Sequence, residues 1–196
     1  RCAEPAMIVA ATLGTNPVMI YAGQELGETG MYFEGFSGMD GRSTIFDYWG
    51  MASIQAWANK GKFDGKNLTD EQRELRAFYQ QLLTLAREEK AITEGMMYDL
   101  EYAQGEGFNR HEQFTYLRKK DDSVLLVVAN FDDRKVDCTI RIPEDAFQYL
   151  AMPELKKAEA VDLLTGQPVA IGAFNHETPI TVTLPAWTGM ILKITK

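Results

Sequence analysis

The sequence changes its character near residue 95, and this change limits the folds that the chain can adopt. Before Gly95 the apolar residues recur mainly at helical spacing. After Gly95 come short runs with the two-residue period of strands, separated by turn residues. We therefore predict an α+β chain, with a helix-rich part over residues 1–94 and an all-β antiparallel sandwich over residues 95–196.

Seven strands are predicted in the second part. Residues 124–129 are apolar throughout, as expected of a central strand that is covered on both faces. Residues 136–142 alternate between apolar and polar side chains, so one face of that strand should meet water. The predicted strands lie at residues 97–102, 114–118, 124–130, 136–142, 158–162, 180–184 and 190–195, with turns at Asp121-Asp122, Asp132-Asp133 and Thr165-Gly166.

The chain begins with a helix and a strand that both need cover. Residues 3–13 have Pro5 in the first turn of a predicted helix whose surface is almost wholly apolar. After Asn16-Pro17, residues 18–22 have the composition of a strand that is buried on both faces. A helix, a short turn and a buried strand form the end of a β/α unit.

The longest predicted helix covers residues 69–90. Thr69 and Gln72 have the spacing of a capping box at its start. Its apolar residues form one stripe, so the helix should pack on a larger body. A shorter helix is predicted at residues 51–58.

Composition and charge exclude several classes of protein. Hydrophobic residues make up 45% of the chain and charged residues 24%, which is typical of an ordered globular protein. The formal net charge of -8 would repel nucleic acids and anionic membranes, and Arg118-Lys119-Lys120 is the one short basic run. We therefore expect neither nucleic acid nor membrane as a partner.

The residue types that carry metal or nucleophilic chemistry are isolated in the sequence. Cys2 and Cys138 lie far apart, and Cys138 falls on the inward face of a predicted strand, which favours a buried free thiol. His111 and His176 lie in predicted loops and are interpreted as surface residues. The paired aspartates fit hairpin turns better than a calcium site. We expect no metal or cofactor in this chain.

Residues 23–50 form a long segment that combines seven glycines with many aromatic residues and has no regular period. Such long irregular loops are uncommon and are usually either functional or disordered, and the aromatic residues argue against disorder. Sites for sugars combine flat aromatic surfaces with fixed hydrogen-bonding groups, and this segment offers both.

Two blocks of sequence resemble the α-amylase family of glycoside hydrolases. Residues 14–28, GTNPVMIYAGQELGE, are similar to the eighth strand of that family's TIM barrel and the loop after it. Residues 41–49, GRSTIFDYW, are similar to the next loop segment in some bacterial members. The long helix and the sandwich follow in the order of that family's last barrel helix and C-terminal domain. The resemblance implies the last β/α unit of a (β/α)8 barrel over residues 1–94 and the C-terminal domain over residues 95–196.

The resemblance implies a retaining α-glucan hydrolase that acts on starch, maltodextrin or related α-glucosides. Its catalytic carboxylates, which lie about 5 Å apart in retaining enzymes, would come from strands upstream of Arg1, so this chain alone should be inactive. An α-glucan or maltooligosaccharide would be the partner of the parent protein. The candidate substrate-binding residues are Gln24, Glu25, Arg42, Tyr48 and Trp49.

Each candidate also has a structural interpretation. Glu25 either contacts substrate or ties its loop to neighbouring arginines, and the second role is favoured. Arg42 fits an ion pair with Asp40 or Asp47 better than a sugar contact. Tyr48 and Trp49 fit equally well as stacking residues and as packing beneath the loop.

Three other functions are considered. A transglycosylase or isomerase of the same family would share both blocks. A non-catalytic carbohydrate-binding module would need exposed aromatic residues on the sandwich, where the candidates are Phe147, Tyr149, Phe174 and Trp187. A purely structural sandwich would cover the apolar stripe of the long helix. A strand at residues 18–22 would lack its neighbouring barrel strands and would leave backbone hydrogen-bonding groups unpaired. The chain is therefore expected either to rearrange there against the sandwich or to self-associate.

Overall fold

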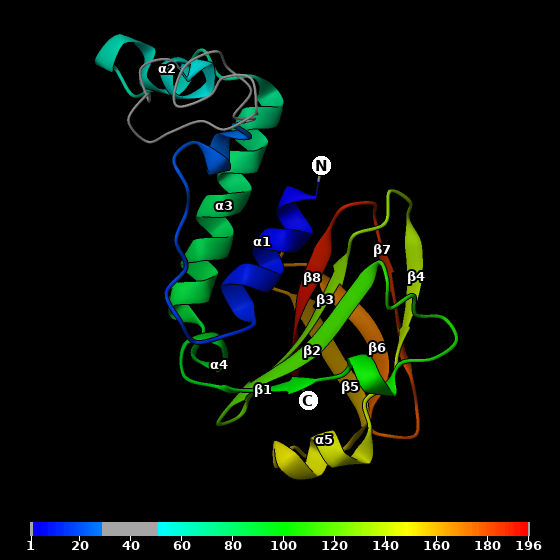
Figure 1. Cartoon of the computed structure of the whole chain (residues 1–196). Helices are drawn as coiled ribbons and strands as arrows, with labels where there is room; N and C mark the ends of the chain where they lie inside the picture. The colour runs from blue at the N-terminus through cyan, green and yellow to red at the C-terminus, as the bar shows by residue number, and fades with distance from the viewer. Residues whose placement is uncertain (1, 29–50, 196) are drawn as a thin grey trace. The chain divides into compact units, whose positions relative to one another are not determined.

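A computed structural model describes residues 2–28 and 51–195 of the chain (Figure 1). The chain divides into two compact units. One, which we call the β unit, combines residues 1–17 with residues 82–196, and the other, the α unit, covers residues 18–81. Compactness thus groups the first helix with the strands. The boundary between residues 94 and 95 separates the part that resembles a barrel from the part that resembles a C-terminal domain, and it stays a prediction.

The β unit contains two antiparallel sheets (Figure 1). The larger has six strands in the order β1-β2-β3-β8-β5-β6, and the smaller pairs β4 with β7. The prediction of an antiparallel β structure is confirmed. The strands are β1 (Met96–Asp99), β2 (Gln113–Lys120), β3 (Ser123–Asn130), β4 (Val136–Ile140), β5 (Leu155–Asp162), β6 (Pro168–Phe174), β7 (Ile180–Leu184) and β8 (Gly189–Thr195).

Burial explains the two strand patterns seen in the sequence. β3 lies between β2 and β8, where Leu126 pairs with Leu117 on one side and Leu192 on the other, and all three side chains are fully buried. β4 has one exposed face, because Asp137 is exposed while Cys138 is buried in the core that the two sheets share. Cys138 is a free thiol, and burial raises its pKa to about 11.

The helices begin and end close to the predicted residues. In the capping box, the Thr69 backbone N–H donates to Gln72 Oε1 (3.0 Å) and the Gln72 backbone N–H donates to Thr69 Oγ1 (3.2 Å). No helix among the described residues combines the length and apolar composition that a membrane span requires. The α-helices are α1 (Ala3–Thr12), α2 (Ala52–Ala58), α3 (Asp70–Glu88), α4 (Lys90–Thr93) and α5 (Glu144–Tyr149).

The apolar helix α1 is covered by the sheet of its own unit. It packs against β3 and β8, and Ile8 is 1% exposed. Thr12 forms a hydrogen bond of 2.5 Å with the hydroxyl of the buried Tyr116 on β2. These contacts bury one face of the helix, whereas Ala6 and Ala10 on the other face are exposed.

Three local predictions were wrong or incomplete. Residues 18–22 do not form a strand, and the Met19 side chain is 89% exposed. A strand needs a hydrogen-bonding neighbour, and no described segment pairs with these residues. The predicted strand 97–102 ends at Asp99 and gives way to a 3-10 turn. α5 and β6 were not predicted, since α5 has only six residues and β6 contains Gly172 at a φ of +73°.

Arg118 is buried at the junction between the helices and the sheet of the β unit. Its side chain is 2% exposed, although the sequence placed it in a basic surface run. The guanidinium donates four hydrogen bonds to backbone carbonyls and has no carboxylate partner among the described residues. Its acceptors are the carbonyl oxygens of Leu13 (2.9 Å), Ala91 (3.0 Å), Ile92 (2.6 Å) and Gly95 (2.9 Å).

His176 and Glu154 form an ion pair on the surface of the β unit. Their hydrogen bond raises the pKa of His176 above its ordinary 6.5 and lowers the pKa of Glu154 below its ordinary 4.5. The contribution of His176 to stability is therefore full below pH 6.5 and is lost as the pH rises through the folded pKa. The contribution of Glu154 is present above pH 4.5 and is lost as the pH falls through the folded pKa.

We expect Glu154→Gln to lower the pKa of His176 towards its ordinary value, because the amide removes the charge that holds the imidazolium. The nearby carboxylates of Glu144 and Glu177 remain in this variant and keep part of the shift. An NMR titration of the His176 ring protons in both proteins measures the change. An unchanged His176 pKa in the variant would contradict the ion pair.

Candidate functional site

The loop residues that carry the family resemblance fold into a tight turn in the α unit. Gln24–Leu26 form one 3-10 turn, called η1, between Gly23 and Gly27, which both have a left-handed backbone. A Cβ atom at Gly23 would lie 2.9 Å from Cβ of Glu28, so this position needs glycine for space as well as for its φ of +83°. The backbone N–H groups of Leu26 and Glu28 both donate to the Gly23 carbonyl.

Side chains anchor this turn to both helices of the α unit. Gln24 Nε2 donates to the Tyr79 hydroxyl on α3 at 3.0 Å. Ser53 Oγ on α2 donates to Glu28 Oε2 at 2.5 Å. Leu26 is 1% exposed and fills the space beneath the turn. The turn therefore presents its remaining polar groups from a fixed backbone.

The predicted site residues have different surroundings. Gln24 bonds within the unit at both ends of its amide, since Oε1 accepts from the Tyr21 backbone N–H at 3.2 Å. The Glu25 carboxylate is half-buried, and no residue within 2–28 or 51–195 forms an ion pair with it. A carboxylate in this setting can accept hydrogen bonds from substrate hydroxyls. Arg42, Tyr48 and Trp49 lie outside the described residues.

The sequence did not indicate which side chains hold the turn. Tyr79 falls on the apolar stripe of the long helix, and this pattern does not indicate that its hydroxyl bonds Gln24. Glu28 belongs to the block that carries the resemblance, but its partner Ser53 lies 25 residues away. Ser53 lies inside the helix predicted at residues 51–58, and no local pattern links its hydroxyl to Glu28.

A small hollow lies beside Trp57 in the same unit. Its volume is about 250 Å³. The Trp57 and Phe63 rings meet edge to face at 5.3 Å, and the Arg76 guanidinium lies 5.6 Å from the centre of the Trp57 ring. Phe63 is 61% exposed and has a left-handed backbone with a φ of +52°. The hollow thus combines two aromatic rings with a cation.

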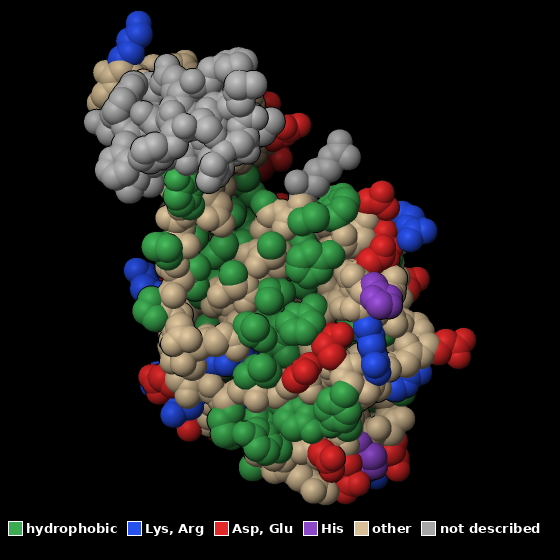
Figure 2. Space-filling model, in the orientation of Figure 1, with side chains coloured by type: hydrophobic (Ala, Val, Ile, Leu, Met, Phe, Trp, Pro, Cys, Tyr) green, Lys and Arg blue, Asp and Glu red, His purple; other side chains and the backbone are tan. Residues whose placement is uncertain are grey.

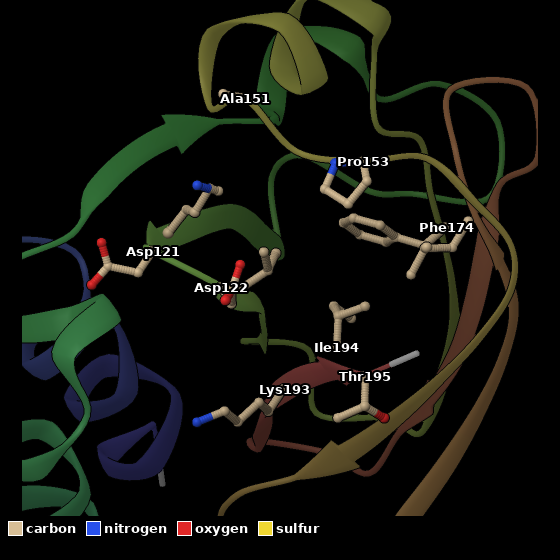
Figure 3. Close-up of a pocket in the computed structure, with 11 residues that line it drawn as sticks. Asp121, Asp122, Ala151, Pro153, Phe174, Lys193, Ile194 and Thr195 are labelled. Carbon is tan, nitrogen blue, oxygen red and sulfur yellow. The ribbon is translucent and has the colours of Figure 1, made fainter.

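A larger hollow of about 490 Å³ lies in the β unit (Figure 3). Phe174 and Pro153 line one end of it, and Asp122 and Lys193 lie nearer the other. Phe174 is only 1% exposed, so its ring serves the core and offers no free face to a ligand. The remaining lining residues are Lys119, Asp121, Val124, Ala151, Leu155, Ile194 and Thr195.

Lys193, one of the charged residues of this hollow, is already paired. Lys193 Nζ donates to Glu89 Oε2 at 2.7 Å, and Ser123 Oγ donates to Glu89 Oε1 at 2.8 Å. Burial alone would raise the pKa of Glu89, but these hydrogen bonds and one from the Ala91 backbone lower it below the ordinary value. Glu89 therefore acts as an anchor for β8 at neutral pH. Within the described parts of the chain, no three His, Cys, Asp or Glu side chains are placed to hold a metal ion.

Solved structures with the same fold cover nearly the whole chain. AmyP in complex with maltotriose matches with a TM-score of 0.63 and 18% identity, over 99% of this chain and 34% of that one. The maltogenic α-amylase AmyB from Thermotoga neapolitana matches with a TM-score of 0.62 and 11% identity, over 100% of this chain and 37% of that one. A trehalulose synthase, MutB, matches with a TM-score of 0.54 and 17% identity, over 99% of this chain and 38% of that one.

These proteins are enzymes of the α-amylase family. No protein-family model matches the sequence, and no curated protein matches it. The chain spans about a third of the length of the solved structures that it resembles. At identities below one fifth, the likeness concerns the fold. The described chain therefore has the fold of about a third of an α-amylase-family enzyme.

Proposed function

We propose that this chain is the C-terminal part of a retaining α-glucan hydrolase that acts on starch, maltodextrin or related α-glucosides. In this proposal residues 1–94 complete a (β/α)8 barrel and residues 95–196 form the C-terminal sandwich. The catalytic carboxylates come from the remainder of the barrel, so the 196-residue chain binds no substrate productively and hydrolyses nothing by itself.

The observation that carries the proposal is the agreement between the loop block and the fold. The block at residues 14–28 resembles the eighth barrel strand and the loop after it; residues 18–22 form no strand, and residues 23–28 fold into a turn that is hydrogen-bonded to α2 and α3. In a barrel enzyme the loops after the strands face the substrate. Structures of α-amylases, one of them in complex with maltotriose, match the chain over nearly its whole length.

We assign substrate contacts to Glu25, Arg42, Tyr48 and Trp49, and a positioning role to Gln24. The half-buried carboxylate of Glu25 supports its part in this assignment, because it can accept hydrogen bonds from sugar hydroxyls. Gln24 supports the site through the conformation of the turn, since both ends of its amide are used within the α unit. Arg42, Tyr48 and Trp49 are proposed from the sequence alone.

A same-family isomerase or transglycosylase is the second candidate. The match to a trehalulose synthase, with a TM-score of 0.54, favours keeping it beside hydrolysis. The two reactions differ in the acceptor that receives the glycosyl group, which is water in a hydrolase and a sugar hydroxyl in a transferase. Product analysis therefore separates them.

The test compares the 196-residue chain with a protein that is extended upstream of Arg1. We expect only the extended protein to release reducing sugar from soluble starch and maltooligosaccharides. Chromatography of the products from sucrose and from maltotriose distinguishes transfer from hydrolysis. Hydrolysis by the 196-residue chain itself would overturn the proposal that the catalytic carboxylates lie outside it. An extended protein that acts on none of these substrates would overturn the proposed reaction.

A further inference from the structure

Three tyrosines from three different elements gather on the surface of the β unit. Tyr98 lies in β1, Tyr102 in the 3-10 turn η4 (Glu101–Ala103), and Tyr149 at the end of α5. The Tyr98 ring centre lies 6.3 Å from that of Tyr102 and 5.6 Å from that of Tyr149. We call these residues the tyrosine cluster. Figure 2 shows hydrophobic side chains gathered over the region of β1 and α5, with acidic side chains beside them.

Two of the three rings are largely open to solvent. Tyr102 is 56% exposed and Tyr149 is 62% exposed. Two exposed tyrosines that flank a third form a patch, whereas singly scattered surface aromatics are ordinary. Of the other aromatic candidates on this unit, Phe147 and Phe174 are 5% and 1% exposed and belong to the core, and Trp187 is half-buried. The exposed aromatic surface of the β unit is thus concentrated at the tyrosine cluster.

The fold holds the tyrosine cluster in place. Tyr98 packs against the core, and its hydroxyl forms a 2.7 Å hydrogen bond with the Tyr102 hydroxyl. Arg110 Nη2 donates to the Tyr102 carbonyl at 2.9 Å, which fixes η4 from the next loop. The Asp99 carboxylate accepts from the Glu101 backbone N–H at 2.9 Å. Because the rings are already ordered, a ligand that stacks on them loses little affinity to side-chain ordering.

The charges around the tyrosine cluster disfavour an anionic ligand. Asp99 and Asp145 are exposed close to Tyr98. Burial, the hydrogen bond with Tyr102 and these carboxylates raise the pKa of Tyr98 to about 12, so its hydroxyl stays protonated at neutral pH. An anion would be repelled here. A sugar would place its apolar C–H faces on the rings and direct its hydroxyls towards the phenol and carboxylate oxygens.

The inclination of the rings bears on the shape of the ligand. Tyr102 and Tyr149 are tilted by 54° and 55° relative to Tyr98, so the rings do not form one flat platform. A flat, β-linked glucan ribbon would therefore meet one ring at a time. An α-1,4-linked chain coils, so its successive sugars turn their faces in different directions and can meet inclined rings.

We propose that the tyrosine cluster is a binding site for an α-linked glucan chain. The choice of an α-glucan among neutral sugars rests on the function proposed above, whereas the stacking chemistry rests on the cluster itself. The site belongs to the β unit, while Gln24 and Glu25 belong to the α unit. Binding at the tyrosine cluster needs no catalytic carboxylate and can be measured on the 196-residue chain.

The test is affinity electrophoresis in gels that contain amylose, together with calorimetric titration with maltoheptaose. We expect the wild-type chain to be retarded and to bind maltoheptaose. The double variant Tyr102→Ala/Tyr149→Ala should bind at least about tenfold more weakly, since it removes both open rings. The variant Tyr102→Phe/Tyr149→Phe keeps the rings and should remain within about threefold of the wild type. Phe63→Ala, which removes an exposed aromatic of the α unit, should leave the affinity unchanged.

Each outcome decides a different part of the inference. No retardation of the wild type, or equal retardation of the double alanine variant, overturns the site, provided that thermal unfolding shows the variant to be folded. Equal binding of cellohexaose and maltoheptaose overturns the preference for α-glucans. A wild-type dimer that the double alanine variant dissociates, seen by sedimentation, would instead make the tyrosine cluster a protein contact. If glucan binding holds while the extended protein hydrolyses nothing, the site stands and the proposed reaction falls.

Discussion

Replacing Arg118 with methionine should lower the free energy of unfolding of the β unit by about 3–5 kcal/mol. Methionine fills a similar volume but donates no hydrogen bond, so four backbone carbonyls, two buried and two partly buried, lose their donor at once. Leaving a buried acceptor unpaired costs about 1–3 kcal/mol, and two of the four carbonyls belong to the fully buried residues Ala91 and Ile92. The loss would fall on the attachment of α1 and α4 to β2, the elements that the guanidinium joins.

Urea unfolding followed by circular dichroism measures this change. Arg118→Lys keeps the positive charge but changes the hydrogen-bonding geometry. The guanidinium reaches its four acceptors with three nitrogen atoms, whereas the lysine ammonium has one. We expect the lysine variant to lose about 2 kcal/mol. Arg87→Met is the matched control, since the Arg87 side chain is 75% exposed and pairs only with its neighbour Glu88 among the described residues, and it should stay within about 0.5 kcal/mol. A loss below about 1 kcal/mol in Arg118→Met would contradict the conclusion that the hydrogen bonds of Arg118 hold α1 and α4 against β2.

Replacing Gly95 with alanine should cost about 3 kcal/mol, although the change adds a single methyl group. A Cβ atom at this position would lie 2.1 Å from the Ala91 carbonyl oxygen and 2.7 Å from the Lys119 carbonyl oxygen. Both are backbone atoms, so neither can swing aside as a flexible side chain would. The chain would have to separate α4 from β2, and this movement would also draw the Gly95 carbonyl away from Arg118.

The control for this substitution is Gly105→Ala. The nearest atom to a Cβ at Gly105 is Nη1 of Arg141 at 3.8 Å, which is ordinary contact, so we expect no loss and a gain of up to about 1 kcal/mol. Because Gly95 and Arg118 share a hydrogen bond, their effects should not add. In the Arg118→Met background, Gly95→Ala should cost less than it does in the wild-type chain. Full additivity of the two losses in urea unfolding would show that the two residues act independently.

Features that depend on neighbours in sequence could be predicted well. The capping box at Thr69 and Gln72 lies within one helical turn, and both of its hydrogen bonds are present. The apolar run of β3 needed only its own composition to be placed in the centre of a sheet. The alternation of β4 likewise predicted which residues face the core, because the pleat of a strand fixes that choice.

Features that depend on distant partners could not be predicted. Arg118 lies beside two lysines and carries the pattern of a surface run, and the carbonyl of Leu13 that it reaches lies 105 residues away. Tyr98 and Tyr149 come together only through the positions of β1 and α5. The run at residues 18–22 has strand composition but no partner among the described residues, so composition alone predicted a strand where none formed.

The packing of α1 on β3 and β8 has a consequence for synthesis on the ribosome. The two elements that bury Ile8 include the last strand of the chain, which ends at Thr195. At the usual pace of translation, roughly 5–20 residues per second, the polypeptide grows for roughly 10 to 40 s between Ile8 and Ile191. During that interval the apolar surface of α1 lacks β8, one of the strands that bury it in the folded chain. Chaperone binding to α1 on the nascent chain should therefore end when β8 emerges.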